Sequence, residues 1–346
     1  MRKVHFFSLC LTLMIVGTVH AQARSIDKIV DKSTLEDEEI KKIEGYAVYW
    51  TDALATSDGE ELNNARKKLA EPLEPDVEMS VFARSIYGDA LRESAQQYLS
   101  NDSTSEMSAV NALQVISLLG TDQGCSVLLT HANSLNEDRD ALRLWASIGL
   151  NNSFQIGLLD ARRVSSIAKL VAGFMTREQD WYILARQFDT ISSIKNMPGP
   201  DTQEQEELEQ LSFQLQANAL VDLLNRIQED GPGQKLVKVL PVVLPALMLE
   251  FVEHGVDAGV KEDAKELIMP SLISFVEHAS SLDPTSEQGA PLNKIYGNAV
   301  GNAAQLISLL LGETTEPDVT IGELWGNNNM QAIQERVAAW NTLLKN

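Results

Sequence analysis

Two copies of the tetrapeptide Phe-Val-Glu-His bring together residue types that bind metal ions. The first copy ends at His254 and the second at His278. If the two segments stacked in register, the carboxylates of Glu253 and Glu277 could join both imidazoles around a metal ion. Each histidine also ends a predicted helix, where the helix dipole favours a partial positive charge, and this interpretation is the stronger one. His131, the one other histidine after residue 23, has no second ligand at metal-binding spacing. We therefore predict no metal site and no cofactor.

Other motifs that carry chemistry are missing from the sequence. No phosphate-binding Gly-x-x-x-x-Gly-Lys-[Ser/Thr] loop, no Gly-x-Gly-x-x-Gly fingerprint after a strand and no Gly-x-Ser-x-Gly elbow occurs. Carboxylates are numerous, and the cluster over residues 204–209 is typical of a solvated helix start. Gly297 and Gly301 lie four residues apart, which in a helix favours close packing against a neighbour. The sequence thus offers no catalytic or cofactor-binding residue that we would single out.

The charge balance narrows the possible partners. The chain of 346 residues has 28 Lys and Arg against 49 Asp and Glu, a net charge of −21. So acidic a protein is a poor candidate for electrostatic binding of nucleic acid or anionic lipid. Its apolar fraction of 44% is ordinary for a globular protein and too high for a disordered one.

Helical spacing dominates the chain after its first residues. Apolar residues recur at intervals of three and four, and no segment alternates long enough to predict a strand. The helix expected over residues 76–99, for example, would bury Val77, Val81, Ala95 and Leu99. The clearest helix breaker is residues 196–201, Asn-Met-Pro-Gly-Pro-Asp. The sequence therefore predicts an all-α protein with an N-terminal helical region over 24–195 and a C-terminal helical region over 202–346.

The most apolar of these segments covers residues 234–252. Pro241 and Pro245 lie inside it, so we expect a short helix, a break and a second helix that begins near a proline. The uncharged stretch between Lys238 and Glu250 is too short to cross a bilayer as a helix, which favours a buried pair of core helices. Further along, Pro270 separates expected helices over 259–268 and 270–280.

Residues 1–23 have the features of a secretory signal peptide. Arg2 and Lys3 precede an apolar stretch, and small residues that suit a signal peptidase follow at Ala21 and Ala23. The alternative is an uncleaved N-terminal anchor. We expect export and cleavage, and a location in a bacterial periplasm or outside the cell. Cys125 would then be the only cysteine left, and its apolar surroundings predict a buried side chain.

Internal similarities point to stacked helical units. Leu-Pro-Ala-Leu before the first Phe-Val-Glu-His corresponds to Met-Pro-Ser-Leu before the second, at an offset of 24 or 25 residues. Residues 111–119, Asn-Ala-Leu-Gln-Val-Ile-Ser-Leu-Leu, match residues 302–310 at seven of nine positions. A glycine that would end a helix follows each copy, at Gly120 and Gly312.

Residues 128–150 combine a leucine-rich helix, a polar turn and a second helix. The helices contribute Leu128, Leu129 and Leu135, then Leu142, Arg143, Ala146 and Leu150, and the turn contributes Asn136 and Asp138. This pattern resembles one HEAT repeat, although the family usually has Asp where this chain has Asn136. The resemblance implies antiparallel helix pairs stacked as an irregular HEAT-like α-solenoid. An irregular helical bundle is the alternative, because the offset of 24 or 25 residues is short for HEAT repeats.

Two classes of function remain. Stacked helix pairs offer extended surfaces for protein partners and need no catalytic motif, which favours an exported, non-enzymatic scaffold. Because the chain is acidic, we expect its partner, another exported protein, to carry a basic patch. The alternative is an (α/α)-toroid-like enzyme that acts on polysaccharide through paired carboxylates beside Trp or Tyr. The five tryptophans are scattered along the chain (Trp50, Trp145, Trp181, Trp325 and Trp340), which favours core anchors over a sugar-binding platform.

Overall fold

A computed structural model describes residues 25–100, 105–229, 232–252, 256–282, 292–313 and 319–344. Over these residues the protein is all-α, as the sequence predicts, and no strand occurs among them. The predicted signal peptide lies outside the described residues. The contacts between residues divide the chain into two compact units, residues 1–128 and residues 129–346.

Before α5 (Asp122–Ala132), the described residues of the first unit form four helices and two short 3₁₀ turns. These are α1 (Asp37–Asp52), η1 (Ala53–Ala55), α2 (Gly59–Ala70), η2 (Glu71–Leu73), α3 (Val81–Leu99) and α4 (Glu106–Ile116). Helix α1 packs on α2 and α3, and α4 packs on α2 and α3. Tyr46 and Tyr87 are fully buried between them, and each donates a hydrogen bond to a backbone oxygen, of Lys68 and Leu69 respectively.

Helix α5 (Asp122–Ala132) spans the boundary, and the second unit holds the remaining elements. They are α6 (Asp140–Gln155), α7 (Ala161–Met175), α8 (Trp181–Ser193), η3 (Ile194–Asn196), α9 (Thr202–Gln228), η4 (Pro232–Val239), α10 (Leu240–Val252), α11 (Ala258–Ser281), α12 (Asn293–Leu310), α13 (Ile321–Gly326) and α14 (Met330–Leu343). The predicted breaker at 196–201 connects η3 to α9 and lies inside this second unit, where α8 and α9 pack on each other.

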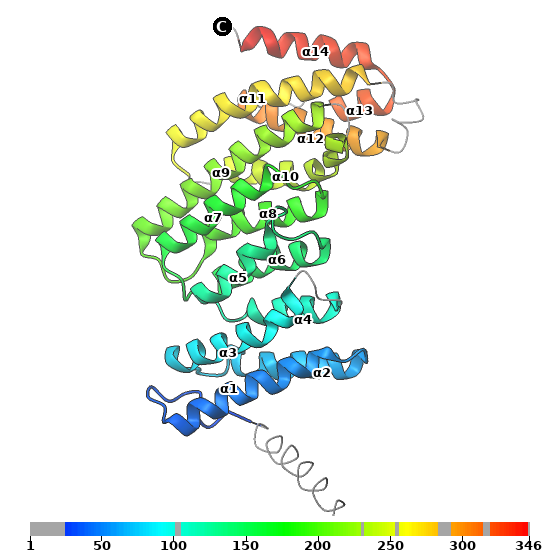
Figure 1. Cartoon of the computed structure of the whole chain (residues 1–346). Helices are drawn as coiled ribbons and strands as arrows, with labels where there is room; N and C mark the ends of the chain where they lie inside the picture. Colours follow the sequence, from blue (N-terminus) through cyan, green and yellow to red (C-terminus); the bar gives the residue numbers. More distant parts are fainter. Residues whose placement is uncertain are drawn as a thin grey trace, which may run out of the picture. The chain divides into compact units, whose positions relative to one another are not determined.

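Helices of the second unit pack mainly with the helix two positions along the chain. One row is formed by α6, α8, α10 and α12, and a second row by α7, α9, α11 and α14 (Figure 1). Contacts of α7 with α8, of α8 with α9 and of α11 with α12 join the two rows. This alternation is the packing order of a two-layered helical solenoid.

The core confirms most of the predicted helix phases. Leu142, Ala146 and Leu150 have no exposed surface, and Cys125 is fully buried as expected. Gly120 and Gly312 both adopt a positive φ, of 61° and 71°, which suits their predicted role as helix stops.

Three helix boundaries differ from the prediction. Helix α5 ends at Ala132, so Leu135 lies outside it and is 66% exposed. Helix α3 begins at Val81 behind the cap Ser80, so Val77 precedes the helix, and Val81 is 81% exposed and not a core residue. Helix α11 continues through Pro270, where the sequence predicts a break. A proline removes one helical hydrogen bond, and burial of α11 against α9, α12 and α14 outweighs that loss.

Candidate functional site

The histidines that the sequence singled out do not form a described site. Glu253 and His254 lie outside the described residues. His131 is buried, and its Nδ1 lies 2.8 Å from Glu137 Oε2. No group of three or more His, Cys, Asp or Glu side chains that could hold a metal ion occurs in the part of the chain that the structure describes.

A buried arginine organises the turn before α6. Arg143 is 6% exposed, and its Nε donates to Glu178 Oε2 at 3.0 Å. Its Nη2 donates to Asp180 and Asp140, and its Nη1 donates to the backbone oxygens of Glu137 and Asp138. The guanidinium thus ties α6 to the start of α8 and to the turn between α5 and α6. With its donors engaged inside the fold, this cluster has a structural role.

Glu137 extends the same cluster. Arg139 and His131 both contact its carboxylate, which is 1% exposed. Burial by itself would raise the pKa of Glu137, but the hydrogen bonds from Arg139 and His131 outweigh it, and the pKa lies below its usual value of 4.5.

Another buried carboxylate joins the two rows of helices. Glu250 of α10 is 3% exposed and accepts hydrogen bonds from Gln216 of α9 at 2.9 Å and from Ser192 of α8 at 2.9 Å. Lys195 Nζ lies 3.1 Å from the same carboxylate. Because a buried charge needs this degree of compensation, the cluster fixes α10 against α8 and α9.

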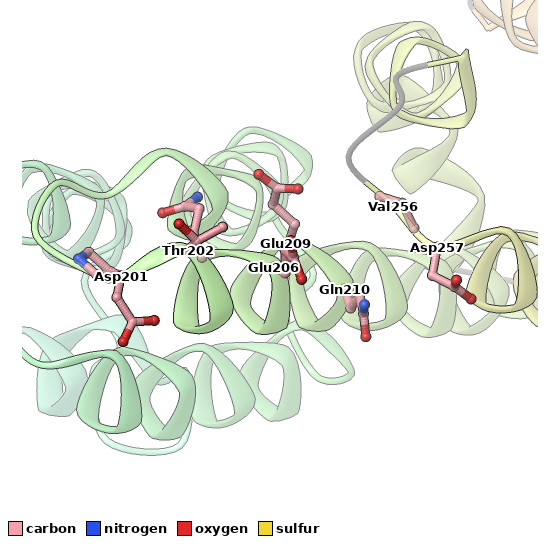
Figure 2. A pocket seen from close by; sticks show the side chains of 9 residues that line it. Asp201, Thr202, Glu206, Glu209, Gln210, Val256 and Asp257 are labelled. Carbon is pink, nitrogen blue, oxygen red and sulfur yellow. The ribbon is translucent and has the colours of Figure 1, made fainter.

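An open groove follows the first three turns of α9. It has a volume of about 650 Å³ and is lined by Pro200, Asp201, Thr202, Gln205, Glu206, Glu209, Gln210, Val256 and Asp257. We call it the acidic groove, since four of these residues carry carboxylates and none carries a cation. Figure 2 shows that Glu209 and Gln210 extend to opposite sides of α9.

The carboxylates of the acidic groove fall into two kinds. Asp201 and Asp257 are helix caps, which accept hydrogen bonds from the backbone at Glu204 and at Gly259. Glu206 and Glu209 have no hydrogen bond or ion pair with any described residue. A cationic partner could therefore pair with these two side chains without breaking an internal contact.

A second cavity, of about 770 Å³, lies among α12, α13 and α14. Its polar wall comes from Asn298, Asn302 and Gln305 of α12 and from Arg336 of α14, and Trp340 lines it as well. We call it the amide pocket. Gly297 and Gly301 border it. Gly297 packs closely as the sequence predicts, since an added Cβ would lie 2.7 Å from Trp325 Cδ1, whereas a Cβ on Gly301 would lie 3.7 Å from Gly322 Cα, an ordinary van der Waals contact.

A third cavity, of about 390 Å³, lies in the first unit and has one carboxylate, Glu106, in its wall. Two carboxylates beside Trp or Tyr, the arrangement expected of a glycan-cleaving toroid, occur in none of these three cavities. Trp325 and Trp340 are buried core anchors, whereas Trp181 is 37% exposed and has Lys238 Nζ 6.0 Å from its ring centroid.

Among the described residues, no helix is both long enough and apolar enough to cross a membrane.

Comparisons with known proteins place the chain in no family. No family model matches it, and no curated protein matches it. Two solved structures that match are engineered proteins from a structural genomics consortium, each 16% identical with a TM-score of 0.32. The match covers 75% of this chain and 96% of the first structure, and 90% of this chain and 84% of the second. A likeness at this TM-score carries no argument about fold or function.

Proposed function

We propose that the protein is an exported, non-enzymatic helical scaffold that binds another exported protein. The acidic groove carries this proposal, because its wall holds four carboxylates and no cation. Two of them, Glu206 and Glu209, are available to a partner, and the net charge of −21 extends the attraction beyond contact distance. The partner would present a basic patch of Lys or Arg to the groove.

The wider setting of this proposal comes from the sequence. The first 23 residues would direct export and be removed by cleavage, and the packing of alternate helices supports a HEAT-like solenoid as the scaffold. Such a fold offers binding surfaces without catalytic residues. Binding of the partner would need no cofactor, no nucleic acid and no membrane span in the mature chain.

Neutralising the two available carboxylates tests the groove. The partner is first captured with the wild-type chain from the native envelope fraction, identified and purified. The double variant Glu206→Gln and Glu209→Gln should then associate about tenfold more slowly with it at low salt, because part of the attractive field is lost. The matched control is Glu207→Gln with Glu335→Gln, which changes the net charge equally but lies outside the groove lining.

Salt supplies the second arm of this experiment. Association with the wild-type chain should slow as the salt rises to about 0.5 M, where the Debye length falls to a few ångströms. Equal rates for the groove variant and the control would contradict the assignment of the groove. Cleavage of a glycan or peptide by the purified chain, abolished in one carboxylate-pair variant that remains folded, would replace the scaffold with the toroid-like enzyme.

A further inference from the structure

The two copies of the repeated nonapeptide use the same amides in different ways. In the first copy, Asn111 is 6% exposed and donates to the backbone oxygen of Met107 at 2.8 Å. Gln114 accepts a hydrogen bond from Arg66 at 2.6 Å. In the second copy, Asn302 and Gln305 line the amide pocket, and their side-chain amides form no hydrogen bond with any described residue. The amides that the first unit uses internally are thus available to a ligand in the second.

The free amides follow one line along α12. Asn298, Asn302 and Gln305 occupy positions i, i+4 and i+7, which place them on one helix face. At a rise of about 1.5 Å per residue, Asn298 and Asn302 are about 6 Å apart along the axis. Two residues of an extended peptide span about 6.6 Å. Each side-chain amide offers one donor group and one acceptor, the same pair that a peptide unit presents. The pair Asn298 and Asn302 therefore suits every second residue of an extended chain, and Gln305 lies one further turn along the same face.

Arg336 adds a charge preference. It is half-buried in the wall of the pocket, and its guanidinium has no hydrogen bond or ion pair with any described residue. The carboxylate in the pocket wall, Glu313, instead accepts from Ser308 Oγ at 2.7 Å. A guanidinium in such a position binds a carboxylate through two parallel hydrogen bonds.

We propose that the amide pocket binds an extended peptide segment of a partner, with a carboxylate of that peptide on Arg336. Asn298 and Asn302 hold alternate backbone amides, and Gln305 continues the line. The cavity of about 770 Å³ lies within the usual range for ligand sites. Trp340, which is 3% exposed, forms part of the wall and offers little ring surface for a sugar to stack on, which favours a peptide over a glycan. This site is separate from the acidic groove, and neither proposal depends on the other.

The probe is a library of random twelve-residue peptides displayed on phage and selected on the full chain in about 0.15 M salt, where the long-range repulsion by the acidic surface is screened. Selected peptides should share an Asp or Glu at one fixed position. A synthetic copy should bind about tenfold more weakly to the Asn302→Ala and Gln305→Ala variants, because each loses hydrogen bonds to the peptide. The control Asn218→Ala removes an exposed amide on α9 and should leave the affinity unchanged.

Two further measurements separate this mode of binding from a merely structural effect. Replacing the shared acidic residue of the peptide by its amide should weaken binding to the wild type about tenfold or more, and should have no effect in the Arg336→Gln variant, while the control Arg186→Gln keeps the full preference. N-methylation of the peptide backbone should abolish binding at every second position and be tolerated at the positions between.

Three results would overturn the proposal: selected peptides without a shared acidic position, equal affinity for the Asn302→Ala variant and the wild type, or tolerance of every N-methyl group. Maltohexaose and chitohexaose serve as glycan probes, and binding of either that is lost in Asn302→Ala would assign the pocket to a sugar instead. Melting temperatures of all variants are measured alongside. Since the three side-chain amides make no hydrogen bond with any described residue, we expect these temperatures to remain close to that of the wild type.

Discussion

Arg143 is the side chain whose loss should affect stability most at the residue scale. Its replacement by Met leaves Glu178, which is 1% exposed, as a buried carboxylate without its ion pair. We expect the free energy of unfolding to fall by about 3 to 5 kcal/mol. The control Arg186→Met breaks an exposed pair with Asp189 and should cost less than about 1 kcal/mol. Urea unfolding measures both, and similar values for the two variants would refute a structural role for the Arg143 cluster.

The lowered pKa of Glu137 predicts how the stability of the fold depends on pH. Its pKa in the folded chain lies below the usual value of 4.5, so its ionised form stabilises the fold. This contribution is fully present above about pH 4.5 and is lost as the pH falls through the lowered pKa of the folded chain. The Glu137→Gln variant should therefore lose less stability than the wild type between pH 5 and pH 3 or so. Parallel unfolding curves at several pH values provide the measurement, and identical pH profiles would show that this carboxylate contributes nothing.

At the scale of elements, the contact between α12 and α13 depends on the absence of a side chain at Gly297. Trp325 lies against this glycine, donates from Nε1 to Asn293 Oδ1 at 2.8 Å and stacks on Tyr296. Gly297→Ala should lower the free energy of unfolding by about 1 to 3 kcal/mol, because the new Cβ displaces the indole.

The matched control for this substitution is Gly45→Ala in α1. A Cβ at Gly45 would meet nothing within 4 Å, so the helical preference of Ala should stabilise the chain by about 0.5 to 1 kcal/mol. Thermal unfolding followed by circular dichroism compares the two. If the free energy of unfolding changed in the same direction in both variants, the close approach of Trp325 to Gly297 would not contribute to stability.

Helices of this protein were predictable from the sequence where the pattern of buried apolar residues and the local signals for helix ends agree. The spacing of Leu142, Ala146 and Leu150 located α6 and its buried face, because a helix that packs on one side must repeat its apolar residues. Pro270 shows the opposite case. Its local effect argues for a helix end, and the helix continues because packing of α11 on three neighbours is a tertiary effect that local sequence does not contain.

The cavities were harder to predict, since each is a product of packing between separate elements. Asn302 and Gln305 were visible in the repeated nonapeptide, but nothing in that nonapeptide distinguishes them from Asn111 and Gln114. The difference arises from their neighbours: Arg66 of α2 donates to the Gln114 side chain, and no described residue hydrogen-bonds to the side-chain amide of Gln305. Likewise, Asp257 joins the acidic groove only because α11 begins near α9.

At the scale of the whole molecule, the proposed export predicts where the protein is found and at which residue it begins. Expressed with its own N-terminus in a bacterium, the protein should be recovered outside the cytoplasm and begin at Gln22 or Arg24, because signal peptidase cleaves after small residues. N-terminal sequencing of the purified protein checks this. An intact Met1 on cytoplasmic protein would contradict it, and a chain with Ala21 and Ala23 replaced by Leu, which removes the small residues, should remain uncleaved.

The packing of alternate helices has a consequence for how an exported chain acquires its structure. Because helices of the second unit contact partners one, two or three positions along the chain, loop closure for each contact spans a short length of sequence. Low contact order speeds folding, and order can spread from one helix pair to the next. If the chain is exported as proposed and emerges from a translocation channel N-terminus first, folding can begin on the far side of the channel while the rest of the chain follows. Each newly released helix then packs against helices that are already folded.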